Sequence, residues 1–378
     1  MNCSGIDALS GRPAEVNFQS RIESVSPAEG GERYLAPGWI DLQVNGFAGV
    51  DYNSPAAAQE EIGRSIRVLF STGVTRFYPT VITGSPEDMQ GALRNLAAAK
   101  EGLAEGEAIE GFHVEGPHIS PEDGPRGAHP RRWVRRPDVH EFHRMQDAAR
   151  GHIRLVTLAP EWPEAPRYIE TLAGEGIVVA IGHTDASPAQ IAEAVRAGAS
   201  MSTHLGNGAG AVLPSRPNYL WEQLAEDRLA IGLIVDGIHL PASFVKVALR
   251  AKGIDRSVLV TDAVMPACCA PGRYKLGEQE VELTPENRVV LAGQTRLAGS
   301  TLRMCDGIAN LVCLAGLSLA EAVRMATVNP ARVAGIAARQ AGLAPGERAD
   351  LVEFNFDAGA RRIGIAKTYL GGRLVYSA

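Results

Sequence analysis

The 378-residue sequence is poor in cysteine, and its few cysteines follow no metal-binding or disulfide pattern. They are Cys3, Cys268, Cys269, Cys305 and Cys313. Their number is odd, and their spacing resembles neither a zinc ribbon nor a disulfide framework. A cysteine-stapled scaffold is therefore excluded, and we expect a reduced, cytoplasmic protein.

Long apolar runs and an excess of basic residues are absent as well. No stretch reaches the roughly 20 apolar residues that a membrane-spanning helix needs, and residues 1–30 lack the apolar run of a secretory signal. The chain carries 37 basic against 43 acidic residues, a formal net charge of −6. A nucleic-acid surface would need a basic patch. We therefore expect neither a membrane nor a nucleic acid among the partners.

The sequence does contain a regular alternation of short apolar stretches with amphipathic helical patterns, such as those at 56–70, 188–197 and 241–251. The apolar stretches are 38–44, 75–81, 109–115, 153–159, 177–183, 200–204, 230–236 and 257–262. Eight strands separated by helices predict an α/β fold, a parallel (β/α)8 barrel of the TIM type, over residues 36–340. The alternative is an open, doubly wound sheet. It would be expected to carry GxGxxG after its first strand, and the "GFAG" found there does not match.

The two ends of the chain do not fit the barrel pattern. Residues 1–35 and 341–378 are polar and turn-rich with short β patterns, and "IAKTYLGGRLVY" predicts a hairpin with Gly-Gly at its turn. We expect both ends to meet in one small β-sandwich domain. The segment 272–297 also alternates like a hairpin and is expected to pack near that domain.

Residues able to do chemistry stand at the ends of several predicted strands. Active sites of such barrels lie at the carboxyl ends of the strands, where the sequence places Glu115, His183, His204 and Asp262. One carboxylate and two imidazoles suit a divalent metal such as zinc, and three protein ligands leave a position open for water. Asp262 is then the candidate general base.

Each of these residues also has a purely structural interpretation. A histidine at a strand end is more often a hydrogen-bonded core or loop residue than a ligand. Glu115 can equally cap a helix or pair with an arginine, and Asp262 in "TDA" can form an Asx turn or a helix N-cap. The residues alone leave these alternatives open.

Several motifs make the chain resemble a known family. They are "PGWIDLQVNG", "GFHVEGPHI", "GHTDAS", "STHLGNG", "VDGIHLP", "LVTDA" and "LAGSTLRM". Over nearly its whole length the chain resembles the amidohydrolase superfamily, and more closely the N-acetylglucosamine-6-phosphate deacetylases. The resemblance implies a metal-dependent enzyme that hydrolyses the acetamide of an amino sugar to acetate and a free amine.

The resemblance also implies roles for individual residues. It assigns the metal ligands to Glu115, His183 and His204. It makes Asp262 the group that takes a proton from the attacking water and passes it to the leaving amine. His129, in "RGAHP", corresponds to a histidine that helps to polarise the acetyl carbonyl.

Further residues are implied on the substrate side. Asn207 and the neighbouring Gly208 fall where the family holds substrate, and His239 corresponds to a histidine on the phosphate side. Arg216 stands near a phosphate-binding arginine that the partner subunit of a homodimer supplies in the family. This segment departs from the family pattern, with Asn-Gly-Ala in place of Asn-Ala-Met. An unphosphorylated or different N-acetylated sugar, another N-acyl or cyclic amide, and a non-catalytic binding barrel therefore stay open.

The first predicted strand bears on the number of metal ions. Many metal-dependent hydrolase barrels have His-x-His at its end, whereas this chain has Gln43 and Asn45. Neutral amides are poorer ligands than imidazole, so we expect one divalent ion per chain, zinc, with the amides making outer hydrogen bonds. Trp133 is a candidate lid aromatic. Cys268 and Cys269 follow the eighth strand and are more often loop residues than site residues at such a place.

Overall fold

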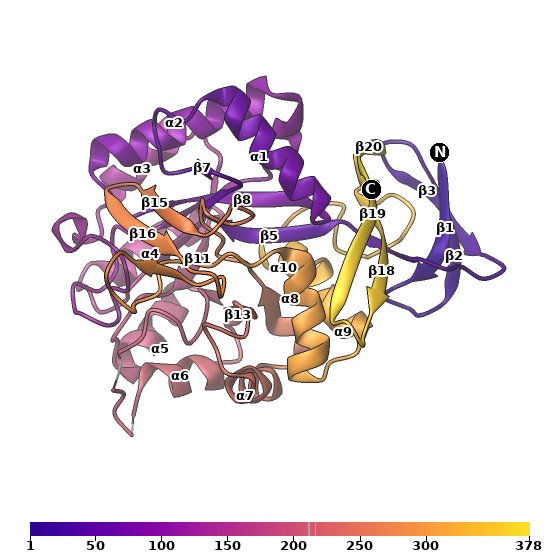
Figure 1. Cartoon of the computed structure of the whole chain (residues 1–378). Coiled ribbons are helices and arrows are strands. Elements are labelled where there is room, and N and C mark those ends of the chain that lie inside the picture. Colours follow the sequence, from indigo (N-terminus) through magenta and orange to yellow (C-terminus); the bar gives the residue numbers. More distant parts are fainter. Residues whose placement is uncertain (211, 216) are drawn as a thin grey trace.

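The computed structural model describes residues 1–210, 212–215 and 217–378. Eight parallel strands form one sheet around a central axis, as predicted, and the (β/α)8 fold class is confirmed (Figure 1). The barrel strands are β5 (Trp39–Val44), β8 (Val74–Ile82), β9 (Phe112–Glu115), β10 (Ile153–Leu158), β11 (Val178–Ile181), β12 (Met201–Ser202), β13 (Ala230–Leu233) and β14 (Ser257–Leu259).

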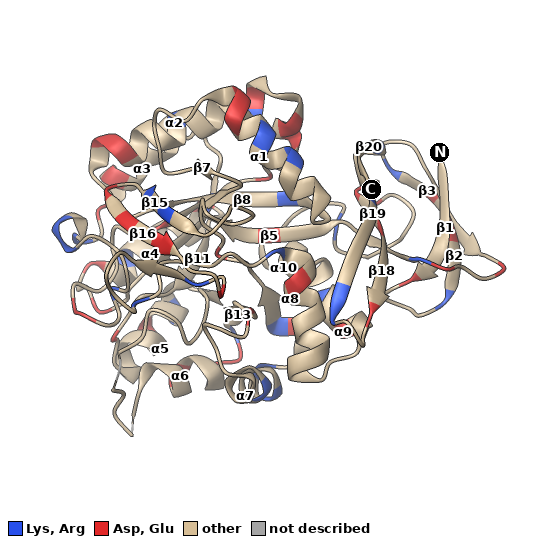
Figure 2. Cartoon of the chain, viewed as in Figure 1, with Lys and Arg blue, Asp and Glu red and all other residues tan. Residues whose placement is uncertain are grey.

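Helices surround the barrel. The α-helices are α1 (Gln59–Ser71), α2 (Pro86–Gly102), α3 (Val139–Ala148), α4 (Ala165–Gly174), α5 (Pro188–Ala197), α6 (Tyr219–Ala225), α7 (Ala242–Lys252), α8 (Met304–Asn310), α9 (Leu319–Met325) and α10 (Val328–Val333). Short helical turns are η1 (Ala104–Ala108), η2 (Arg131–Trp133), η3 (Ile254–Arg256) and the π-helical η4 (Leu311–Ala315). Acidic and basic residues are interspersed on α1, as a balanced composition leads one to expect (Figure 2).

The barrel closes between β5 and β14, the two ends of the strand order. A single bridge joins Val44 to Ala263, and the buried Asp41 accepts hydrogen bonds from the hydroxyl and the backbone N–H of Thr261. Burial raises the pKa of Asp41 to about 7, although these hydrogen bonds oppose the rise. The closure brings the first strand beside the loop that follows the eighth.

The two chain ends form one seven-stranded sheet beside the barrel. Its strands are β1 (Asn2–Asp7), β2 (Pro13–Phe18), β3 (Ile22–Pro27), β4 (Tyr34–Pro37), β18 (Leu351–Asp357), β19 (Arg362–Leu370) and β20 (Arg373–Ser377). Although β18, β4 and β1 lie between β19 and β2 in the sheet, the rings of Phe18 and Tyr369 are only 5.3 Å apart. The sheet therefore bends back on itself into a sandwich (Figure 1). Gly371 and Gly372, both at positive φ, make the predicted hairpin turn.

A buried ion cluster joins this sandwich to the barrel. Asp350, just before β18, lies 2.7 Å from Arg339 Nη1 and 2.8 Å from Arg76 Nε, and it also accepts the Gly371 N–H. Burial alone would raise the pKa of Asp350, but the two guanidinium groups lower it to about 2. One carboxylate thus joins three parts of the chain: the second barrel strand, the end of the barrel and the last hairpin.

The segment 272–297 does not pack near the small domain, and that prediction is wrong. It forms a separate three-stranded sheet, β15 (Gly272–Leu276), β16 (Gln279–Leu283) and β17 (Val289–Leu291), on the side of the barrel away from the chain ends (Figure 1). The reason is apolar packing, because Val281 and Leu283 are buried against Val264 in the loop after β14. A short ribbon of β6 (Gly46–Phe47) and β7 (Val50–Asp51) follows β5.

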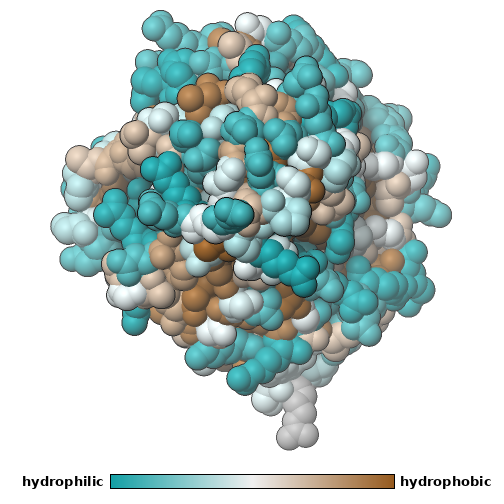
Figure 3. Space-filling model, turned by 90° about the vertical axis from the view of Figure 1, so that its right-hand side faces the viewer, coloured by the Kyte–Doolittle hydropathy of each residue, from teal (hydrophilic) through white to brown (hydrophobic). Residues whose placement is uncertain are grey.

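The surface is mainly hydrophilic on the face shown in Figure 3, with an apolar area in its lower half. Among the residues that the structure describes, the exposed large apolar side chains are Met1, Val212, Trp221, Val247 and Leu374. Among the described residues, no helix combines the length and the apolar character needed to cross a membrane.

Candidate active site

The predicted site residues stand at the mouth of the barrel, but three of them lie beyond their strands. Glu115 is the last residue of β9, whereas His183 and His204 follow β11 and β12 by two residues and Asp262 follows β14 by three. The prediction that these three end their strands is therefore wrong in detail. All three have positive φ, 51°, 27° and 51° respectively, a conformation that is costly for non-glycine residues and clusters at functional sites.

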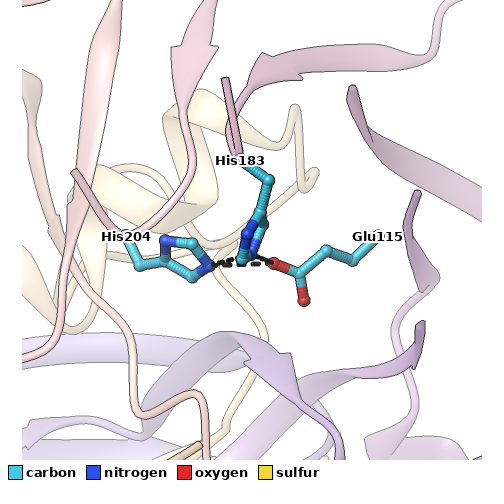
Figure 4. A group of neighbouring side chains, drawn as sticks. All are labelled: Glu115, His183 and His204. Carbon is cyan, nitrogen blue, oxygen red and sulfur yellow. Dashed lines mark hydrogen bonds and ion pairs between the residues drawn. The ribbon is translucent and has the colours of Figure 1, made fainter. Parts of the chain in front are cut away.

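The side chains of Glu115, His183 and His204 converge on one point (Figure 4). Glu115 Oε1 lies 2.8 Å from His204 Nε2 and 3.1 Å from His183 Nε2, and the two Nε2 atoms are 3.1 Å apart. All three side chains are buried. In the described part of the chain, this is the one group of three or more His, Cys, Asp or Glu residues close enough to share a metal ion.

The donor atoms fit a divalent metal. His183 Nδ1 lies 2.8 Å from the carbonyl oxygen of Pro125, and because a carbonyl only accepts, Nδ1 carries the proton and Nε2 presents its lone pair. A hydrogen bond from the ring nitrogen that faces away from the metal typically fixes the tautomer of a metal-binding histidine. Gly208 packs against the same ring, since a Cβ there would lie 2.5 Å from His183 Nδ1. One carboxylate oxygen and two imidazole nitrogens make a set that zinc accepts.

The pKa shifts in the cluster follow from burial and from the neighbours. Burial would raise the pKa of Glu115, but the imidazoles of His183 and His204 that face it hold this pKa well below its usual range. Burial opposes protonation of His204, yet Glu115 raises its pKa to about 8. The pKa of Asp262 is raised to about 6, first by burial and then by the charge of Glu115.

The two amides of the first strand hold carboxylates. Asp262 Oδ1 lies 2.6 Å from Asn45 Nδ2 and 3.1 Å from Gln43 Nε2, and the Gln43 amide also donates to Glu115 Oε2 at 3.0 Å. Their N–H groups point at the acids, so these side chains stand outside the group of converging ligand atoms. One oxygen of Asp262 is thereby taken up by two donors.

His129 stands next to the cluster. Its ring is 4.4 Å from that of His183, centroid to centroid, and its Nδ1 lies 2.9 Å from the hydroxyl of Thr83. Burial and, after it, the neighbouring imidazole of His183 lower the pKa of His129 to about 3. The imidazole is therefore neutral near pH 7.

These groups open onto a cavity of about 1150 Å³. Its lining includes the site residues Asn45, Glu115, His129, His183, His204, Asn207, Gly208, His239 and Asp262. His239 Nδ1 lies 2.6 Å from Asp236 Oδ2. Trp133 and residues 275–279 of the three-stranded sheet line the outer part, where the Trp133 indole N–H donates to Glu278. Cys268 and Cys269 are not among the lining residues, and Arg216 lies outside the described residues.

Two contributors to this site, Thr83 and the three-stranded sheet, were not predicted from the sequence. Thr83 follows the second strand directly, and asking what stands after every strand, not only those with His, Asp or Glu, would have found it. The alternating pattern of residues 272–297 predicted β structure, but nothing in the sequence indicated where in the fold this sheet would pack.

Comparison with known proteins agrees with this geometry. Residues 34–375 match the Amidohydrolase family. The chain is 35% identical to N-acetylglucosamine-6-phosphate deacetylase of Bos taurus, covering 96% of this chain and 88% of that protein. It is 35% identical to the Bacillus subtilis protein of the same name, covering 85% and 81%.

A solved structure gives the same result. A mutant N-acetyl-D-glucosamine-6-phosphate deacetylase from Mycobacterium smegmatis, in complex with N-acetyl-D-glucosamine-6-phosphate, superposes with a TM-score of 0.91 at 29% identity, over 100% of this chain and 99% of that one. The fold, the buried cluster and the relatives agree on a hydrolase that acts on amide bonds. The chain therefore belongs to the amidohydrolase family, within the N-acetylglucosamine-6-phosphate deacetylases.

Proposed function

We propose that this chain hydrolyses N-acetylglucosamine 6-phosphate to glucosamine 6-phosphate and acetate. The observation that carries the proposal is the meeting of Glu115, His183, His204 and Asp262 in one cavity, in a chain whose relatives bear the name of this activity. Amide hydrolysis needs a metal site and a base of this kind, because an amide is both a poor electrophile and a poor source of a leaving group.

We further propose one zinc ion per chain, held by Glu115, His183 and His204. When bound, zinc supplies Lewis acidity and lowers the pKa of water toward 7. A second ion would have to recruit the amide oxygens of Gln43 and Asn45, which are poorer ligands than imidazole. The N–H groups of both amides are turned toward carboxylates. Both points support a single ion.

Asp262 is proposed to move the proton. Its Oδ1 is occupied by the amides of Asn45 and Gln43, which leaves Oδ2 to take a proton from the attacking water. The same oxygen then gives the proton to the sugar nitrogen as the C–N bond breaks. His129 borders the cavity next to His183 and is proposed to face the acetyl carbonyl.

The substrate side of the proposal rests on the cavity lining. Asn207 and Gly208 lie at the cavity beside His183 and are proposed to hold the sugar. His239 lines the cavity with its ring held by Asp236 at 2.6 Å, and on the family pattern it is proposed to contact the phosphate side of the substrate. Arg216 is proposed as a second phosphate contact, on the family pattern, from the partner subunit.

A homodimer is proposed with that contact. Trp221 on α6 and Val247 on α7 are 56% and 46% exposed, on two neighbouring helices that follow position 216 in the sequence; exposed apolar side chains on adjoining helices suit an interface. All five cysteines are free, which supports a reducing, cytoplasmic compartment.

Acetate release from zinc-loaded protein tests the function. N-acetylglucosamine 6-phosphate, unphosphorylated N-acetylglucosamine, and an N-acetyl amino acid would be compared at equal concentration. We expect the phosphate ester to give the highest kcat/KM. A higher kcat/KM for the unphosphorylated sugar would overturn the phosphate assignment, and hydrolysis of only the amino acid derivative would overturn the substrate class.

A further inference from the structure

We propose that Thr83 is a positioning residue for His129: its hydroxyl donates to Nδ1 and so keeps the ring proton on Nε2, facing the cavity. The inference rests on the proposed function, because it gives His129 a defined hydrogen-bond donor for the acetyl carbonyl oxygen. It concerns a residue outside both the ligand set and the substrate contacts.

The hydroxyl of Thr83 has two acceptors within reach. It lies 2.9 Å from His129 Nδ1 and 3.4 Å from the backbone carbonyl oxygen of Glu115. A hydroxyl has a single hydrogen, and O–H donors prefer distances of about 2.5–3.0 Å. In the proposed arrangement the hydroxyl hydrogen lies on the short contact, where the distance is the better one for an O–H donor. The carbonyl at 3.4 Å is a weak competitor.

The direction of this bond decides the tautomer of His129. A neutral imidazole has one N–H, so a ring that accepts at Nδ1 carries its proton on Nε2. Among the described residues, Nε2 has no hydrogen-bond partner, and the ring borders the cavity. In amide hydrolysis the carbonyl oxygen gains negative charge, and a donor aimed at it stabilises the transition state. The other tautomer would present a lone pair to that oxygen instead.

The surroundings hold Thr83 firmly in this role. Thr83 is 3% exposed, so little water competes for its hydroxyl. Gly116 approaches it so closely that a Cβ at that position would lie 2.2 Å from Thr83 Oγ1. Since Gly116 follows the ligand Glu115 directly, the same turn positions a metal ligand and the partner of His129.

A pair of substitutions separates positioning from simple space filling. Thr83→Val keeps the shape and removes the hydroxyl, whereas Thr83→Ser keeps the hydroxyl. We expect Thr83→Val to lower kcat by about 10- to 100-fold, the range typical when a hydrogen bond that orients an active-site side chain is lost, with KM and zinc content within about twofold of wild type. Thr83→Ser is expected to regain most of that loss. A purely structural role predicts the reverse order, because Ser leaves a void and Val does not.

Ring nitrogen NMR tests the tautomer without turnover. In zinc-loaded wild-type protein labelled with 15N-histidine, the His129 signals, assigned by their loss in His129→Gln, should show a proton on Nε2 and none on Nδ1. A proton on Nδ1 in the wild type, or a Thr83→Val variant with kcat within twofold of wild type, would overturn the proposal. If the wild type hydrolyses no N-acetyl sugar, the proposed function fails, while the NMR result still decides the tautomer. If Thr83→Val does not fold, the wild-type spectrum alone decides.

Discussion

Two clusters of buried charge invite comparison, one at the junction of barrel and sandwich and one at the mouth of the barrel. At the junction, the Asp350 carboxylate faces two guanidinium groups and a backbone N–H, so the chain itself supplies every partner. At the mouth, Glu115 faces imidazole nitrogens, and the Nε2 of His183 points a lone pair at the same spot. The first cluster is complete without a ligand, whereas the second calls for a cation. Burial of charge thus serves folding in one place and binding in the other.

The largest expected effect is the loss of a ligand from the mouth cluster. Glu115→Gln should lose zinc during purification and show no detectable acetate release, because two imidazoles alone bind the ion weakly. Metal analysis and turnover measure both. The matched control is Glu175→Gln, which removes an exposed carboxylate that also faces a histidine, His143, at 2.8 Å. If Glu115→Gln keeps one zinc per chain, the ligand set is wrong.

The next effect separates chemistry from metal binding within the same cluster. Asp262→Asn should lower kcat by about 10³-fold, within the range for a lost general acid–base, and retain its zinc. The asparagine cannot accept and return the proton. Single-turnover acetate release with zinc analysis of the same sample checks this expectation. Near-normal turnover with bound zinc would contradict the proposed role of Asp262.

A substitution at the junction should lower the stability of the protein and leave its activity unchanged, the opposite of the substitutions at the mouth. Arg339→Met leaves Asp350 buried with one guanidinium fewer, and removing one member of a buried ion pair costs about 3–5 kcal/mol. Urea unfolding should show this loss, while kcat of the folded protein stays unchanged. The control is Arg256→Met, which breaks the exposed pair with Asp227 and should cost less than about 1 kcal/mol. Equal losses in both variants would mean that the junction is not a stabilising cluster.

A smaller effect of the junction cluster should appear in the stability of the protein at acidic pH. The pKa of Asp350 is about 2 in the folded protein, below the roughly 3.9 of an unfolded chain. Its contribution to stability is therefore complete above pH 4 and is lost as the pH falls from 4 toward 2. Unfolding midpoints of metal-free protein should drop over this window, less steeply in Arg339→Met. Parallel curves for the two proteins would show that Asp350 does not contribute.

The smallest effect is expected from the first-strand amides. Asn45→Ala removes the 2.6 Å hydrogen bond to Asp262 but leaves the one from Gln43. We expect about a tenfold lower kcat, at the lower end of the range for lost hydrogen bonds to active-site residues, with one zinc per chain retained. A variant that loses zinc would show that Asn45 supports the metal directly. The prediction that the first-strand amides only hydrogen-bond to carboxylates would then be wrong.

Much of this architecture was predictable from the sequence. The alternation of apolar stretches with helical patterns identified eight strands, because parallel barrel strands are buried and short. The meeting of Glu115, His183 and His204 was predictable too, since carboxyl ends of barrel strands share one edge.

Other features left no trace that periodicity could reveal. The positive φ of His183 and Asp262 is carried by ordinary residues rather than glycine, so the strands end earlier than the apolar pattern suggested. The three-stranded sheet is placed by long-range packing of Val281 on Val264, which no local pattern encodes. Thr83 looks like any threonine until the fold sets it beside His129.

The pairing of β4 with β18 has a consequence for biosynthesis. The whole barrel separates these two strands in the chain, yet they are neighbours in one sheet. During translation β1 to β4 emerge long before β18 to β20. The barrel therefore has time to form while the edge of β4 that later pairs with β18 is still unpaired. Contacts so distant in sequence form slowly, and unpaired edges invite aggregation. The nascent N-terminal strands are therefore the part of the molecule most in need of protection before release.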